Sequence, residues 1–192
     1  VVLSGGSAFG LDSATGVVRY LRERNIGYQT RATNVPIVPA AILYDLGLGD
    51  SMITPDADAG YAACESANQG PTDEGNVGAG AGATVGKILG LGRAMKGGLG
   101  TSSFETGNGI VVGAIVAVNC VGNVVDPATG QIIAGVRNLD GNGFVDTRQM
   151  VRLQINTSQA VAENTTIGLV ATNANFTKTE MTKVAQMAQD AL

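Results

Sequence analysis

The chain has 192 residues, of which 44% are hydrophobic and 15% charged, so it is expected to bury a substantial core as one folded domain. Its net charge is −4 and its 12 lysines and arginines are scattered, which gives no basic stripe for nucleic acid. Two cysteines, Cys64 and Cys120, are too few for a disulfide framework, and no residues have metal-ligand spacing. No apolar stretch is long enough to cross a bilayer, so we expect a cytoplasmic protein without cofactor, metal or membrane partner.

The first part of the chain alternates apolar runs, glycine turns and helical patterns. Residues 1–4 predict a buried strand, and the glycine turn at 5–7 leads into a helix from about Leu11 to Arg24. The apolar run 37–44 fits either a strand or a short buried helix. Residues 57–69 predict a second helix.

The middle of the chain is rich in glycine. Residues 75–86 and 97–101 predict loops, whereas 110–118 predict a strand that is buried on both faces. Residues 126–130 predict a hairpin turn, and 138–154 are polar and predict a loop.

The last part of the chain predicts a strand at 167–172 and a helix at 178–192. Thr177 and Glu180 have the spacing of a capping box at the start of this helix. The expected packed side of the helix consists of Met181, Val184, Ala185, Met187 and Ala188. The alternation of strands and helices predicts an α/β fold with helices outside the sheet.

Three local motifs suggest chemistry that their spacing does not support. Residues 82–87 imitate a phosphate loop, but they have three residues between the glycines instead of four, and Lys87 alone is expected to be a solvated loop lysine. Ser7 imitates a nucleophile elbow, but Phe9 replaces the final glycine. Residues 138–149 imitate a calcium loop, but Gln149 replaces the bidentate glutamate, so an ordinary turn-rich connection is favoured.

The absence of histidine from the sequence excludes Ser-His-Asp and Cys-His mechanisms within these residues. A threonine can instead use its own α-amino group as the base, once the peptide bond before it has been cut. Thr165, which follows Asn164 and precedes the strand-like run 167–172, is the candidate for that role. From the tripeptide alone, a turn followed by the start of a strand is the simpler interpretation.

Six segments in order along the chain strengthen the hypothesis about Thr165. They are VVLSGGSAFGLD (1–12), VPIVPAAILYDL (35–46), GNVGAGAGATVGK (75–87), MKGGLGT (95–101), VNCVG (118–122) and NTTI (164–167). With these segments the chain resembles the self-cleaving β-aminopeptidase and aminopeptidase-esterase family. The Asn-Thr-Thr sequence at 164–166 is more similar to the nylon-oligomer (6-aminohexanoate-oligomer) hydrolases of that family than to members with Gly-Ser at the cut.

The resemblance implies a layered αββα sandwich of the N-terminal-nucleophile type. It also implies cleavage between Asn164 and Thr165, which divides the chain into residues 1–164 and the start of a second chain at 165–192. Family members extend beyond both ends of this sequence, so we expect the single domain 1–192 to be incomplete. The acidic side chains that orient the nucleophile in the family are expected beyond Leu192.

The resemblance assigns roles to four catalytic residues. Thr165 attacks an amide carbonyl, and Lys87 favours the neutral form of its amine, because a nearby cation disfavours protonation. Asn119 contributes an amide donor to the oxyanion. Tyr44 lies near the scissile bond, while the signature Lys96-Gly97-Gly98 forms a structural turn.

The implied function is an N-terminal-threonine amidohydrolase acting through an acyl-enzyme. Its substrates would be peptides, β-amino acid amides or nylon-type oligomers, and it would assemble as a dimer or tetramer of cleaved heterodimers. One alternative is a non-catalytic member of the fold that binds a small molecule through the loops of residues 75–100. The other is an acyltransferase related to ornithine acetyltransferase.

Overall fold

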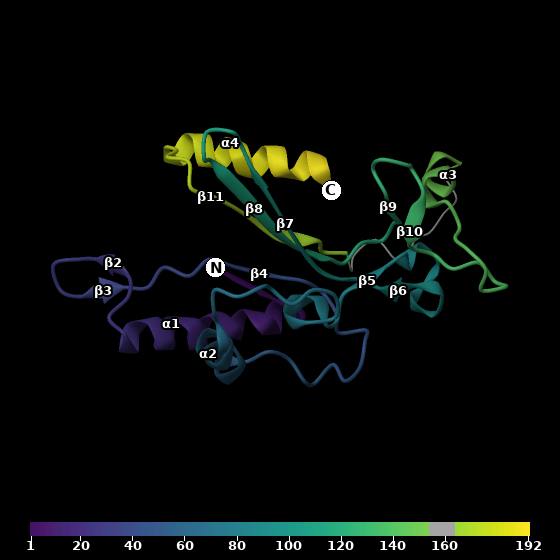
Figure 1. Cartoon of the computed structure of the whole chain (residues 1–192). Helices are drawn as coiled ribbons and strands as arrows, with labels where there is room; N and C mark the ends of the chain where they lie inside the picture. Colours follow the sequence, from purple (N-terminus) through teal and green to yellow (C-terminus); the bar gives the residue numbers. More distant parts are fainter. Residues whose placement is uncertain (154–163) are drawn as a thin grey trace.

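The structure is a computed structural model that describes residues 1–153 and 164–192 (Figure 1). Its mixture of helices and strands confirms the predicted α/β class. The helices are α1 (Ser13–Glu23), α2 (Ala57–Ser66), α3 (Thr147–Arg152) and α4 (Lys178–Ala188). The strands are β1 (Val2–Ser4), β2 (Tyr28–Gln29), β3 (Asn34–Val35), β4 (Ala40–Ile42), β5 (Thr84–Val85), β6 (Met95–Lys96), β7 (Gly98–Glu105), β8 (Val111–Val118), β9 (Val124–Val125), β10 (Ile132–Ala134) and β11 (Ile167–Thr172).

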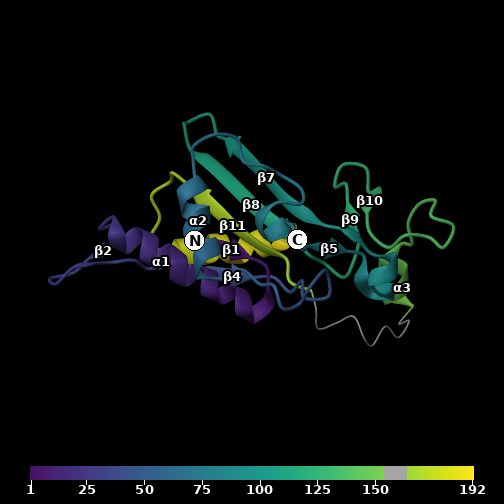
Figure 2. The ribbon, with the colours of Figure 1, turned by 90° about the horizontal axis from the view of Figure 1, so that it is seen from below.

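The central element is an antiparallel sheet of β11, β8 and β7, in that order. Ile167 pairs with Ala117 and Leu99 also pairs with Ala117, so both outer strands are in register with the end of β8. Figure 1 shows α4 over one face of this sheet, with the parallel pair β1–β4 and the helices α1 and α2 beyond the other face. Seen from below, β9, β10 and α3 lie beside one end of the sheet (Figure 2).

The main core lies between this sheet and β1–β4. Both the sheet and the β1–β4 pair contribute side chains to it. Within a strand, every second side chain points to the same face and can therefore enter the core. The cluster consists of Leu43, Ala79, Ala83, Ala117 and Ile167, with Leu3, Ala41 and Leu99 packed against it. A second cluster consists of Ile88, Val136 and Met150, of which Met150 belongs to α3.

Three predicted loops contain regular structure. Residues 75–86 contain the 3-10 turn Gly78–Gly80 and the strand β5. Residues 97–101 were expected to be a loop, but Gly98 begins β7. Glycine is needed at position 97, directly before this strand, because a Cβ there would lie 2.1 Å from the carbonyl oxygen of Val118. The polar stretch 138–154 contains α3, whose start is capped by the carboxylate of Asp146.

Two further predictions agree with these elements, one open choice is settled and one prediction is wrong. The run 37–44, for which two interpretations were open, contains the strand β4. The capping box of Thr177 and Glu180 is confirmed, as is the hairpin at 126–130. The prediction that the strand β8 is buried on both faces is wrong, because Val111 and Val112 are exposed and Ala117 is the one residue of β8 that is buried.

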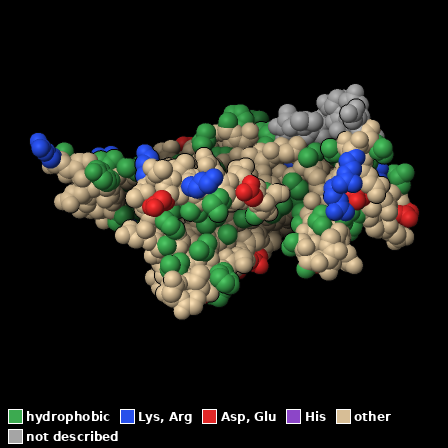
Figure 3. Space-filling view, turned by 90° about the horizontal axis from the view of Figure 1, so that it is seen from above, with side chains coloured by type: hydrophobic (Ala, Val, Ile, Leu, Met, Phe, Trp, Pro, Cys, Tyr) green, Lys and Arg blue, Asp and Glu red, His purple; other side chains and the backbone are tan. Residues whose placement is uncertain are grey.

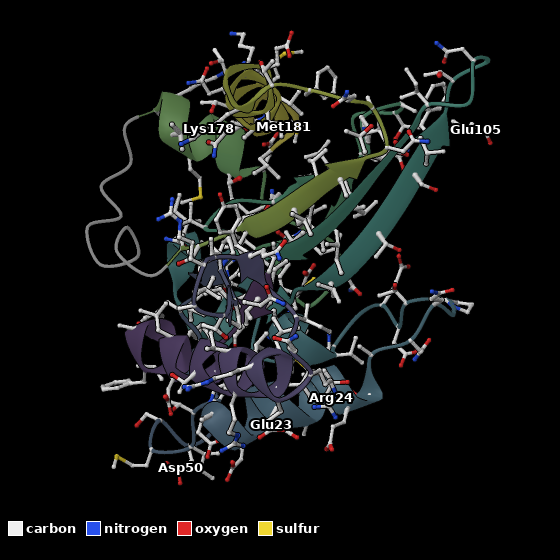
Figure 4. All side chains as sticks on the ribbon, turned by 90° about the vertical axis from the view of Figure 1, so that its left-hand side faces the viewer. Glu23, Arg24, Asp50, Glu105, Lys178 and Met181 are labelled. Atoms are coloured by element: carbon white, nitrogen blue, oxygen red, sulfur yellow. The ribbon has the colours of Figure 1, made fainter. Side chains whose placement is uncertain are left out.

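The packed side of α4 was predicted only in part. Met181, Val184, Ala185 and Ala188 line a groove between α4 and the sheet, and Figure 4 shows Met181 on the helix that lies above the strands. Ala185 is nevertheless exposed, and Met187 is 57% exposed and does not line the groove. At 3.6 residues per turn, Met187 lies roughly 100° around the helix from the centre of this stripe.

Charged side chains are interspersed on the face shown in Figure 3, where the largest basic group lies over α3. Arg148 of that helix is paired with Asp146 at 2.9 Å. Within the two described stretches, no helix combines the length and the apolar character that crossing a bilayer requires.

Helices α1 and α2 cross at a contact that leaves no room for a side chain. A Cβ on Gly60 would lie 1.9 Å from the carbonyl oxygen of Ser13. We expect Gly60→Ala to lower the free energy of unfolding by at least about 1 kcal/mol, because the clash outweighs the roughly 1 kcal/mol gained in helix propensity.

Thermal unfolding followed by circular dichroism measures this loss. Gly100→Ala in β7 is the control, since nothing lies within 4 Å of its added Cβ. Equal melting temperatures for the two variants would contradict the close crossing of α1 and α2.

Candidate functional site

A buried asparagine organises the candidate site. Asn119 directly follows β8 and is 0% exposed. Its Oδ1 accepts hydrogen bonds from Lys87 Nζ at 2.7 Å and from the backbone N–H of Thr84 at 3.1 Å. Its Nδ2 donates to the carbonyl oxygen of Tyr44 at 2.8 Å. An ammonium only donates and a carbonyl only accepts, so these partners fix which way the amide faces.

Lys87 is buried, at 5% exposed, which contradicts the interpretation of a solvated loop lysine. It follows Gly86, which has a φ of 72°, and a Cβ on Gly86 would lie 2.2 Å from the backbone of Gly135. Glycine at 86 is therefore required for the turn that directs Lys87 inward. A lysine this deeply buried is stable only with polar partners, and Asn119 Oδ1 is one of them.

The β8–β11 pairing brings Thr165 to the same asparagine. The backbone N–H of Thr165 donates to the carbonyl oxygen of Asn119 at 3.0 Å. In return, the N–H of Asn119 donates to the Oγ1 of Thr166 at 3.2 Å. Thr165 and Lys87 are thus both bonded to Asn119, one through its main chain and the other through its side chain.

A small pocket opens beside Lys87. It is lined by Tyr44, Asp45, Gly47, Leu48, Gly82, Thr84, Lys87 and Leu91. Its volume is only about 10 Å³, roughly the space of one water molecule, so it is a gap beside Lys87 and does not hold a substrate chain.

The structure therefore brings together all four predicted site residues. Tyr44, Lys87 and Thr165 each hydrogen-bond to Asn119, and the pocket lies at Tyr44 and Lys87. An amide nitrogen carries two hydrogens, so the bond to Tyr44 uses only one of the donors of Asn119. Asn164, on the other side of the predicted cut, is half-buried.

Two residues of the site were missed in the sequence. Thr84 donates two hydrogen bonds to Asn119 Oδ1, one from its backbone N–H at 3.1 Å and one from its hydroxyl at 3.4 Å. Asp45 accepts from the N–H of Gly6 at 2.7 Å, and a Cβ on Gly82 would lie 2.0 Å from its Oδ2. Asp45 thereby joins the glycine turn after β1 to the wall of the pocket. Its position directly after Tyr44 was the only signal available.

Ser7 and the segment 138–149 do not line the pocket. Ser7 donates its N–H to the carbonyl of Leu43 at the start of a 3-10 turn. In the segment resembling a calcium loop, Asn138 Nδ2 donates to Asn142 O at 3.0 Å, and Asp140 Oδ1 accepts from Asn142 N at 3.0 Å. These bonds close the turn on itself, as in an ordinary turn-rich connection. Residues 154–163, which include the end of the predicted polar loop, lie outside the described stretches.

Comparison with known proteins assigns the chain to a class. The sequence model of peptidase family S58 matches residues 1–192. The chain therefore belongs to peptidase family S58, as the sequence segments predicted.

Individual relatives agree with this assignment. An uncharacterized aminopeptidase of Mycobacterium leprae (strain TN) is 41% identical over 202 residues, which are 100% of this chain and 53% of the relative. A 6-aminohexanoate-oligomer endohydrolase of Agromyces sp. (strain KY5R) is 29% identical over 197 residues, which are 100% of this chain and 54% of that enzyme. The chain thus spans about half the length of the curated relatives it matches.

A solved structure shares the fold. The crystal structure of a protein from Pyrococcus horikoshii OT3 superimposes with a TM-score of 0.57 at 19% identity, over 91% of this chain and 42% of that one.

Burial beside Lys87 changes the acidity of one thiol. Burial raises the pKa of Cys120 above its ordinary value, although the nearby Lys87 cation acts in the opposite direction. A raised pKa means less thiolate at neutral pH. In a Cys64→Ser background, we expect iodoacetamide to label Cys120 with a pH midpoint above the usual thiol value of about 8.5. Lys87→Met should move that midpoint further up, and a midpoint below the usual value would contradict this environment.

Proposed function

We propose that the full-length protein is an amide hydrolase whose nucleophile is an N-terminal Thr165, produced when the chain cuts itself after Asn164. The observation that carries this proposal is that Asn119 bonds both the N–H of Thr165 and the ammonium of Lys87. Membership of a peptidase family and the printed names of two relatives, an aminopeptidase and an oligomer endohydrolase, support an amide as the bond that is hydrolysed.

Self-cleavage proceeds by an N-to-O acyl shift. The Oγ of Thr165 attacks the carbonyl carbon of Asn164, an ester bond forms, and the C–N peptide bond breaks as the hydroxyl proton passes to the nitrogen. Water then hydrolyses the ester, which releases the carboxylate of Asn164 and restores the hydroxyl of Thr165. The former peptide nitrogen becomes a free amine.

In turnover, the α-amine of Thr165 accepts the hydroxyl proton as Oγ attacks the substrate carbonyl. Free α-amines have a pKa of about 7.7 to 8.0, and the nearby cation of Lys87 favours the neutral, basic form. Asn119 is enclosed in the uncut chain, so its second N–H reaches the oxyanion only once cleavage has freed Asn164 from Thr165, and Tyr44 holds that amide through its carbonyl. The leaving amine takes the proton, and water releases the acyl group.

The substrate classes rest on the family and on the relatives' names, because the pocket beside Lys87 has room for only about one water molecule. They are peptides with a free amino end, β-amino acid amides and 6-aminohexanoate oligomers, each of which presents an amide bond. These three classes are the substrates we propose.

We also infer that the complete protein forms an αββα sandwich, supported by the positions of α4 and of α1 and α2 on opposite sides of the strands in Figure 1. Assembly into dimers or tetramers of cleaved heterodimers, and a cytoplasmic location, remain predictions.

The experiment that tests the proposal is intact mass and amino-terminal sequencing of the full-length protein. We expect a new terminus that begins Thr165-Thr166-Ile167 in the wild type and in Thr165→Ser, which keeps a hydroxyl. Thr165→Ala should stay uncut, because it has no nucleophile. A single uncut chain in all three proteins would refute the self-cleavage and favour a small-molecule binding protein. Cleavage with acyl transfer to an added amine, but not to water, would favour an acyltransferase.

Lys87 gives a second prediction. Lys87→Met should slow amide hydrolysis by at least about 100-fold and move the rise of the pH–rate profile to higher pH, because the amine then loses its proton less readily. Lys96→Met is the control, since Lys96 lies in β6 and bonds the carbonyl of Ala81, outside the pocket lining. Steady-state kinetics across pH measure both. Equal profiles for the two variants would remove Lys87 from the mechanism.

A further inference from the structure

The strand pair β8–β11 ends with an unusual exchange of hydrogen bonds. In a regular antiparallel ladder, two opposite residues exchange N–H···O bonds between their backbones. Here Thr165 donates its N–H to the carbonyl of Asn119 at 3.0 Å, but the N–H of Asn119 donates to the side-chain Oγ1 of Thr166 at 3.2 Å. A hydroxyl therefore replaces the backbone acceptor at the rung that Thr165 forms with Asn119.

A hydroxyl at residue 166 is more than a residue that suits a strand. Valine would suit a strand equally well, since both are β-branched. Asn119 is 0% exposed, however, so its N–H needs an acceptor within the protein. The Thr166 hydroxyl supplies one, and it belongs to the residue directly after the proposed nucleophile.

The same bond has a consequence for the cut chain. Cleavage before Thr165 removes the covalent restraint on its nitrogen, and the new terminus is then held only from its carboxyl side and by its own contacts. The Thr166–Asn119 bond lies on that carboxyl side and does not involve the broken peptide. It can therefore persist from the precursor to the mature protein.

We propose that Thr166 is a positioning residue, whose hydroxyl bond to the Asn119 N–H keeps Thr165 in register with Asn119 before and after self-cleavage. This inference rests on the proposed function. It assigns to Thr166 no contact with substrate: the hydroxyl acts through Asn119, the residue that also holds Lys87 and the carbonyl of Tyr44.

Three variants of the full-length protein test the role of the hydroxyl. Thr166→Val keeps the shape and removes the acceptor, whereas Thr166→Ser keeps the acceptor. Thr172→Val is the matched control, because Thr172 stands at the other end of β11 and its Oγ1 accepts from the N–H of Ala174 at 3.1 Å. The control thus loses the same kind of bond on the same strand, away from the site.

We expect Thr166→Val to slow self-cleavage and to lower the kcat of the cleaved enzyme at least about tenfold, with KM little changed, because an unsatisfied buried N–H shifts the nucleophile. Thr166→Ser should stay within about twofold of the wild type, as should Thr172→Val. In precursors held uncut by Thr165→Ala, hydrogen exchange at the Asn119 amide should be faster with Thr166→Val than with Thr172→Val.

The outcomes separate this inference from the proposed function. If the wild type cuts itself and Thr166→Val cuts and turns over equally fast, the positioning role is refuted while the proposed function stands. If Thr166→Val and Thr172→Val slow turnover alike, the effect is one of general strand stability and the inference also fails. If the wild type is not cut and hydrolyses no amide, the proposed function fails and takes the inference with it.

Discussion

The buried amide of Asn119 is the constraint on which the rest of the site depends. It is fully enclosed, and its oxygen and nitrogen are matched to a lysine ammonium and a backbone carbonyl. Removing the Asn119 amide takes a hydrogen-bond partner from the buried Lys87 ammonium and from the Tyr44 carbonyl. A buried polar group left unsatisfied costs about 1–3 kcal/mol, and a charged group costs more. The side chain therefore joins three segments that are far apart in the sequence: the end of β4, the turn after β5 and the end of β8.

Glycines make this convergence possible. Backbone segments pass one another so closely around the site that a Cβ on Gly86 or Gly97 would lie about 2 Å from a neighbouring backbone atom. These glycines are consequently part of the site, although they bear no chemistry. With them, a small core rich in alanine holds a lysine at 5% exposure.

Local signals in the sequence were sufficient for much of the fold. The capping box of α4, the hairpin turn and the apolar run of β11 each depend on neighbouring residues, and each is present as predicted. The start of β7 was misread, because a glycine that permits close approach resembles a glycine that ends a strand. The burial of Lys87 and the contribution of Thr84 could not be predicted either, since both depend on a partner more than thirty positions away. Thr165 was a candidate from the sequence itself, whereas Lys87, Asn119 and Tyr44 came from the family resemblance. The structure adds the hydrogen bonds of the other three residues to Asn119.

The most direct test of the role of Asn119 is a crystal structure of the full-length protein after self-cleavage. We predict a free amine on Thr165 within hydrogen-bonding distance of the Asn119 carbonyl oxygen, with the Lys87 ammonium on the Asn119 side-chain oxygen. An intact Asn164–Thr165 bond, or a Thr165 terminus displaced from Asn119, would contradict it.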